Sequence, residues 1–229
     1  MSDKLPQAGA AWDDDPSAGA WIEPLLAGFG TSIGENLPAG YPAHAVVPIP
    51  DVDVPVDSLP DDLAWLDTLL AVIEPCTGDQ PVHCGLWEGW AELYDRGADP
   101  RIAPGMAVHV AWPDGERPSE AEQAAARRRA QERLAELRVE RPAAKPLELP
   151  HRRYHLWTGP LRSVTAFRGL IAAPPSLIWP EDRSWFVSVP IYSREAAVGG
   201  PAALVDAVVA ADGLGARRAD PSTVLDIDD

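Results

Sequence analysis

The chain has 229 residues, of which 46% are hydrophobic and 24% charged, so it is long enough to bury a core without disulfide bonds. Its formal net charge of −16 favours a basic partner, because an acidic surface repels nucleic acids and anionic membranes. No apolar stretch approaches the roughly 20 residues that a membrane-spanning helix requires. We therefore expect neither nucleic acid nor a membrane as a partner.

The charge is distributed unevenly. Residues 1–116 contain 20 acidic and 3 basic residues, a net charge of −17, whereas residues 117–168 contain 6 acidic and 12 basic residues, a net charge of +6. Residues 169–229 contain 9 acidic and 4 basic residues, a net charge of −5. The chain begins without a signal-peptide pattern, and its two cysteines, Cys76 and Cys84, are expected to be free thiols in a reducing cytoplasm.

Local patterns in the first third of the chain predict few regular elements. The first 20 residues are rich in Ala, Gly and Asp, so we expect a flexible leader over 1–20 and a single domain over 21–229. Prolines around 45–49 confine a strand there to a sheet edge or an extended loop. Leucine and isoleucine residues at helical spacing predict a helix from about residue 60 that ends at Pro75.

The remaining elements alternate irregularly. Strands are predicted over 82–86, 106–112, 152–157 and 184–192. Helical segments are predicted over 88–94, 119–138, 160–171 and 201–211. Ser119 and Glu122 have the spacing of a capping box, so 119–141 is expected to be a charged, mostly solvent-facing helical segment that projects from the domain. This order predicts an α+β fold in which helices flank a central, mainly antiparallel sheet of about four to six strands.

Nine tryptophans are the most distinctive feature, and four of them lie in the two compact motifs Trp87-Glu88-Gly89-Trp90 and Trp179-Pro180-Glu181-Asp182-Arg183-Ser184-Trp185. Tryptophan presents a large, rigid surface with one N–H donor. Several of them close together build either a well-defined core or a flat binding wall, and the sequence leaves both open.

Four segments of the chain resemble an uncharacterised family of hypothetical proteins from high-GC bacteria. They are the two tryptophan motifs, Arg153-Tyr154-His155-Leu156-Trp157-Thr158-Gly159-Pro160-Leu161 and Val198-Gly199-Gly200. The family has no assigned activity, so the resemblance implies an arrangement of motifs and no function. The chain departs from the family at Gly85-Leu86, where family members tend to have an aromatic pair. It also departs at Ile49, where they often have a histidine before a proline.

The candidate binding residues come from the strand at 152–157 and from the two tryptophan motifs. Alternation along that strand places Arg153, His155 and Trp157 on one face, which is exposed or lines a groove if Tyr154 and Leu156 face the core. The full candidate set is Trp87, Glu88, Trp90, Arg153, His155, Trp157, Glu181, Asp182 and Arg183. If the protein is an enzyme, Glu88, His155 and Asp182 are the catalytic candidates, because a carboxyl group against tryptophan can act as an acid and glycosidases use two carboxylates.

Other chemistries have weaker support. Cys76, His83 and Cys84 are suitable zinc ligands, but neighbouring strand residues point to opposite faces, so His83 and Cys84 cannot easily share one ion. Cys84 could act as a nucleophile with His155 if the fold brings them together. Gly199-Gly200-Pro201 could bind phosphate but is also a common turn. No cofactor or metal is predicted.

Three functions remain open. The leading hypothesis is a non-enzymatic protein-interaction module, such as an inhibitor, an immunity-like protein or a regulator, that docks a basic partner. The first alternative is a small-molecule or carbohydrate-binding enzyme with a Trp, carboxylate and His site. The second alternative is a structural or oligomeric module without a ligand.

Overall fold

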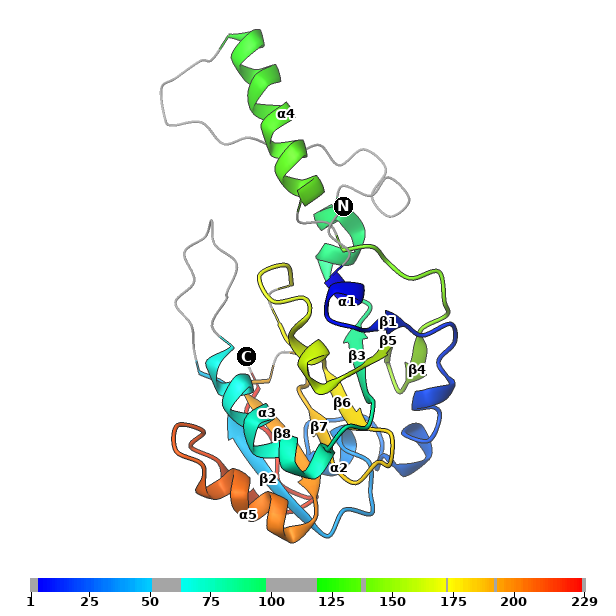
Figure 1. The fold of residues 1–229 in the computed structure, drawn as a ribbon, viewed down its shortest axis with the longest axis vertical. Helices are drawn as coiled ribbons and strands as arrows, with labels where there is room; N and C mark the ends of the chain where they lie inside the picture. The colour runs from blue at the N-terminus through cyan, green and yellow to red at the C-terminus, as the bar shows by residue number, and fades with distance from the viewer. Residues whose placement is uncertain are drawn as a thin grey trace. The chain divides into compact units, whose positions relative to one another are not determined.

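The computed structural model describes residues 4–50, 63–97, 119–136, 139–171, 173–191 and 193–227 (Figure 1). The predicted strand at 106–112 lies outside these residues. The described chain forms two compact units, one between residues 89 and 141 and the other from the segments on either side. The single domain expected over 21–229 stays a prediction.

The larger unit is built on a nine-stranded antiparallel sheet, which establishes the α+β class and exceeds the predicted number of strands. The strands are β1 (Ala11–Trp12), β2 (Ala43–Pro48), β3 (Val82–Trp87), β4 (Leu147–Leu149), β5 (Arg152–Gly159), β6 (Leu177–Pro180), β7 (Phe186–Ser188), β8 (Glu195–Gly200) and β9 (Arg217–Ala219). Their order is β1-β5-β3-β6-β7-β8-β2-β9, and β4 shares the outer edge of β5 with β1.

Helices α3 and α5 pack against each other, and α5 lies on β2 and β8 (Figure 1). The α-helices of the larger unit are α1 (Lys4–Gln7), α2 (Ile33–Asn36), α3 (Ala64–Thr77) and α5 (Ala202–Ala210). Its 3₁₀ helices are η1 (Ser17–Gly19), η2 (Glu23–Leu25) and η4 (Leu161–Thr165). The predicted helix at 160–171 is thus realised as a short 3₁₀ helix followed by turns.

Helix α3 forms because its apolar residues recur at helical spacing. Leu66, Leu69 and Ile73 are fully buried along one face. Pro75 was expected to end the helix, but it lies inside the last turn. The helix continues to Thr77 and ends at Gly78, whose φ of 60° places it in the left-handed region that favours glycine.

Residues 4–20 were predicted as a flexible leader, but from Lys4 onward they form part of the larger unit. Leu5 is 2% exposed, and β1 pairs with the outer edge of β5. The indole of Trp12 stacks on Phe167 and meets Trp157 edge-on. Pairing with a strand more than 140 residues away therefore orders a segment whose composition suggested flexibility.

Strand β2 was expected at a sheet edge, but it pairs with both β8 and β9. Its proline does not prevent this, because Pro48 is the last residue of the strand and β9 pairs only with His44–Val46. Strand β8 includes Gly199 and Gly200, which the sequence suggested as a turn. A side chain at position 199 would approach Leu37 and Tyr41 within 2.7 and 2.9 Å, so close packing over the backbone requires glycine there.

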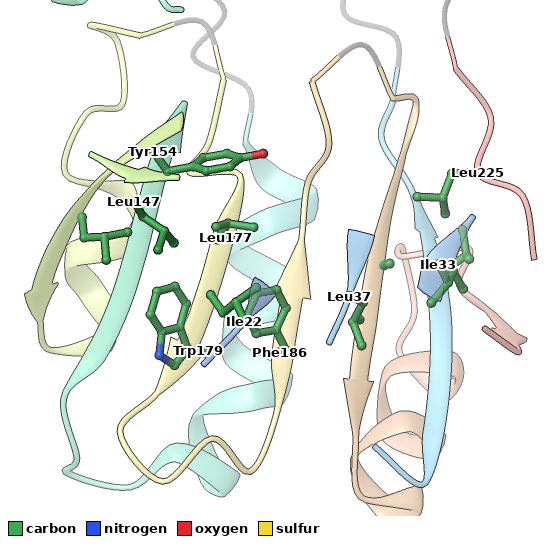
Figure 2. Packing of buried hydrophobic residues seen from close by; sticks show 12 residues of the cluster. Ile22, Ile33, Leu37, Leu147, Tyr154, Leu177, Trp179, Phe186 and Leu225 are labelled. Carbon is green, nitrogen blue, oxygen red and sulfur yellow. The ribbon is translucent and has the colours of Figure 1, made fainter. Parts of the chain in front are cut away.

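The main core lies on the sheet face opposite α3 and α5, as Figure 2 shows for Tyr154, Trp179 and Phe186. Trp179 lies parallel to Phe186 at 5.8 Å and meets Trp21 edge-on at 6.2 Å between ring centroids. Residues from α2 and from the segment before it close this face, including Ile22, Ile33 and Leu37. Both faces of the central strands are therefore covered.

The smaller unit contains η3 (Ala91–Gly97) and α4 (Glu120–Glu136). The backbone N–H and hydroxyl of Ser119 both donate to Glu122, which confirms the capping box. The projecting, solvent-facing placement of 119–141 stays a prediction. Within the described chain, no helix is both long and apolar enough to cross a bilayer.

Trp179→Ala tests whether the aromatic stack is the centre of the core. Trp179 is 1% exposed, so we expect the substitution to lower the free energy of unfolding by about 3–5 kcal/mol, measured by urea denaturation followed by circular dichroism. Phe29→Ala is the matched control, because Phe29 is 53% exposed and its loss should cost about 1 kcal/mol or less. Equal losses in the two variants would contradict this description of the core.

Candidate functional site

The Trp-Pro-Glu-Asp-Arg motif forms the turn that follows β6 and lies against the residues before β3. The backbone N–H of Glu181 donates to the carbonyl of Pro81, and that of Asp182 donates to the side-chain oxygen of Gln80. Arg183 has a φ of 56°, which a residue with a side chain adopts only at some cost. This turn is therefore tightly held in a conformation that places two carboxylates, Glu181 and Asp182, in solvent.

His83 connects this turn to the interior of the sheet. The register of β3 places His83 opposite Thr158 of β5 on one side and opposite Trp179 of β6 on the other. The imidazole stacks on the Trp179 indole, with 5.3 Å between ring centroids. Its Nε2 atom lies 2.7 Å from a carboxylate oxygen of Glu181, and its Nδ1 atom lies 2.8 Å from the hydroxyl of Thr158.

The hydrogen bonds continue beyond Thr158 to a fourth side chain. The Thr158 hydroxyl donates to Oδ1 of Asp13 at 2.8 Å, just past the end of β1. Asp13, Thr158, His83 and Glu181 thus form a chain of three hydrogen bonds across four neighbouring strands. We call these four residues the His83 chain.

The His83 chain needs one proton more than its neutral donors supply. Three hydrogen bonds require three protons, whereas a threonine hydroxyl and a neutral imidazole provide two. The third proton can reside on the imidazole while the hydroxyl donates to Asp13. It can equally reside on Asp13 while the hydroxyl donates to His83 and His83 donates to Glu181. The two arrangements have the same total charge and differ in which end of the chain carries the proton.

Asp13 is the inner end of the chain. Burial raises the pKa of the Asp13 carboxyl, although the Thr158 hydroxyl and the charge of His83 act in the opposite direction. Its second oxygen, Oδ2, is buried and accepts no hydrogen bond from the described residues. Both observations favour a proton on the Asp13 carboxyl, because an ionised buried carboxylate needs hydrogen-bond donors or positive charges as partners.

Arg183 and Tyr41 lie beside the same turn. The guanidinium of Arg183 lies over the indole of Trp21, 4.8 Å from the ring centroid, as in a cation–π contact. Burial raises the pKa of Tyr41, whose hydroxyl is buried and forms no hydrogen bond with the described residues. Hydrogen bonds from Ser184 lower the pKa of Asp182 even though partial desolvation opposes them, so Asp182 is ionised at neutral pH.

A second polar cluster lies at the other end of β3. Glu88 is 6% exposed, and one of its carboxylate oxygens lies 2.6 Å from Nε of Arg153. Its other oxygen lies 4.0 Å from Nε2 of His155, which is 1% exposed. The backbone N–H of Glu88 donates to the carbonyl of Arg153, so this cluster continues the pairing of β3 with β5.

The structure separates the predicted site residues into two groups. Glu88, Arg153 and His155 lie together, whereas Glu181, Asp182 and Arg183 lie beyond Pro180, which pairs with Val82 at the opposite end of β3. Six residues of strand separate the two ends, or about 20 Å. Glycosidase carboxylates are about 5–10 Å apart, so Glu88 and Asp182 do not form such a pair.

The strand face that was expected to be exposed is largely buried. Arg153 reaches solvent, but His155 and Trp157 are 1% and 0% exposed. Trp12 and Phe167 cover them, which local alternation along 152–157 could not reveal. Trp87 is half-buried, whereas Trp157, Trp179 and Trp185 are fully buried, so these three tryptophans build the core instead of a binding wall. Trp90 belongs to the smaller unit.

The thiols are not arranged for chemistry. Cys76 is exposed, and Cys84 is fully buried with a pKa that burial raises, so the nucleophilic thiolate form is disfavoured. His83 and Cys84 point to opposite faces of β3, as alternation predicts. Across the described ranges, no three His, Cys, Asp or Glu side chains gather closely enough to hold a metal ion.

Comparisons of this chain with protein-family models, with curated proteins and with solved structures found no match.

The His83 chain predicts a pH-dependent stability that Asp13→Asn should change. Because burial raises the pKa of Asp13, the folded protein binds this proton more tightly than the unfolded chain, for which the ordinary value is 3.8. The stability that Asp13 contributes is thus complete below that value and is lost as the pH rises through the folded-state pKa. We expect the free energy of unfolding of the wild type to fall relative to that of Asp13→Asn as the pH rises above 3.8 and through the raised folded-state pKa.

Urea denaturation at several pH values measures this difference. The control is Asp14→Asn, which removes the same charge from the neighbouring exposed position and should follow the wild-type pH dependence. A difference between wild type and Asp13→Asn that does not change with pH would exclude the extra proton at this end of the chain.

Proposed function

We propose that the protein is a non-enzymatic interaction module that docks a basic partner through the two turns beside His83. The observation that carries this proposal is a group of exposed carboxylates on adjoining turns, which belong to Asp79, Glu181 and Asp182. The backbone N–H groups of Glu181 and Asp182 donate to Pro81 and Gln80 and hold the two turns together, so the three carboxylates lie on one part of the surface. We call this surface the acidic turns.

The charge of the acidic turns is not compensated by arginine or lysine side chains of the described chain. Some carboxylates of the larger unit do pair with arginines, as Asp67 does with Arg168, Glu195 with Arg217 and Asp206 with Arg218. Within the described residues, no arginine or lysine forms an ion pair with the acidic turns. Their negative charge is therefore available to a partner.

Long-range electrostatics also favour a basic partner. The net charge of −16 attracts a basic protein from a distance, which raises the association rate, while a local group of carboxylates selects the orientation. Cys76 and Cys84 are free thiols, which supports the cytoplasmic location that we propose for this function.

A peptide of ten lysines tests whether the acidic turns bind basic groups more strongly than the average surface does. The variant Asp79→Asn/Glu181→Gln/Asp182→Asn removes three charges from the turns. We expect it to weaken binding of the labelled peptide at least about tenfold and to reduce the salt dependence of the affinity. Fluorescence anisotropy at two salt concentrations measures both quantities.

The matched control is Glu23→Gln/Glu148→Gln/Asp212→Asn, which removes three exposed carboxylates from other parts of the larger unit. It has the same net charge as the test variant, so the two differ only in where the charge is lost. Equal weakening in both would show attraction to net charge alone and would contradict a defined docking surface. A pull-down from the lysate of the source organism with the same two variants then identifies which retained proteins depend on the acidic turns.

A further inference from the structure

A surface pocket of about 400 Å³ lies between β2 and the segment that carries η2 and α2. It is lined by residues 24–27, 33–34 and 37–41, by His44 and by Pro221. Backbone hydrogen bonds fix its walls, because Ala39 donates to Leu25, Ala27 donates to Gly34 and Gly34 donates to Pro221. The pocket is thus a preformed feature of the larger unit.

The lining is almost entirely apolar. It consists of proline, leucine, isoleucine, alanine and glycine, apart from one tyrosine and one histidine, and it includes no charged side chain. Leu25 is 41% exposed, which leaves apolar surface in contact with water. A volume of several hundred Å³ with mostly apolar walls is typical of sites for small molecules.

Tyr41 and His44 are the two polar side chains of this pocket, and Tyr41 lies near the charges of Asp182 and Arg183, so we take His44 as the group that recognises an uncharged ligand. Residues directly opposite each other in a sheet share a face, so His44 points to the same side as position 199, over which Leu37 and Tyr41 pack. Its side chain is nine-tenths buried, with 9% exposed, and forms no hydrogen bond with the described residues. Burial lowers the pKa of His44 while the nearby Asp220 opposes that effect, so the ring is neutral at pH 7 and offers one donor and one acceptor.

We propose that this pocket binds a small, uncharged and mostly apolar molecule whose single hydrogen-bonding group pairs with the His44 ring. The apolar walls disfavour a charged ligand because they cannot replace its hydration. A carboxylate would in addition meet the negative charge of Asp220, which interacts with His44. The site is distinct from the acidic turns, since none of Asp79, Glu181 and Asp182 lines it, although Tyr41 lies close enough to Asp182 for that charge to affect the pKa of Tyr41.

The dye N-phenyl-1-naphthylamine is a suitable probe, because it is uncharged, carries one N–H group and fluoresces strongly in apolar surroundings. Titration of the full-length protein should give saturable binding at one site per chain. Ala39→Phe places a large side chain on an exposed pocket residue and should weaken binding at least about tenfold. Ala210→Phe makes the same change at the exposed end of α5 and should leave binding unchanged.

The hydrogen bond is tested separately with His44→Phe, which keeps an aromatic ring and should weaken binding about fivefold to tenfold. Histidine-labelled protein provides a readout without substitution, because the probe should shift the NMR signals of His44 and leave those of His83 in place. No saturable binding to the wild type would overturn the proposal. Binding that Ala39→Phe does not weaken, or that leaves the His44 signals unshifted, would also overturn it.

Discussion

The two polar clusters at the ends of β3 depend on the register in which β3 pairs with β5 and β6. Pairing of Val82 with both Gly159 and Pro180 places His83 between Thr158 and Trp179. The same register brings Glu88 to Arg153 six residues further along. A slip of one residue would move His83 to the face that carries Cys84 and would break the His83 chain. The buried apolar residues on both faces of β3 oppose such a slip, because it would exchange their surroundings.

A sheet that is covered on both faces limits where its polar side chains can lie. His83 and His155 belong to neighbouring strands but to opposite faces, and each meets a carboxylate at one end of β3. Buried polar groups need hydrogen-bonding partners, and His83 finds one in Glu181 at 2.7 Å, whereas His155 lies 4.0 Å from the nearest oxygen of Glu88. The carboxylates at the two ends of β3 differ in exposure. Glu88 is buried and paired with Arg153, whereas Glu181 extends into solvent with 64% of its side chain exposed.

Residue spacing in the sequence predicted the helices and strands whose formation depends on neighbouring residues. The leucine spacing predicted α3, alternation predicted β5, and a strand was also predicted at the position of β3. Segments ordered by distant partners were not predictable in the same way. Residues 4–20 resemble a flexible leader until β1 pairs with β5, and Gly199-Gly200 resembles a turn until Leu37 and Tyr41 pack over it.

Some residues of the candidate site could be placed together from the sequence, and others could not. Glu181, Asp182 and Arg183 are neighbours in one motif, so their common location follows from the sequence. The His83 chain joins residues 13, 83, 158 and 181, which no local pattern connects. His83 was considered as a zinc ligand beside Cys84, and the strand register instead gives it a threonine and a glutamate. Local sequence patterns do not reveal the register between strands, because the packing of the whole sheet sets it.

The proton that burial favours on Asp13 constrains how the acidic turns can bind a cation. Glu181 is both the outer end of the chain and one of the three carboxylates proposed for docking. A lysine or arginine of a partner beside Glu181 adds positive charge at the outer end of the chain and so disfavours a proton on Asp13 at the inner end. Proton binding at Asp13 and docking of a basic partner therefore oppose each other. By linkage the docked state binds the Asp13 proton less tightly than the free protein does.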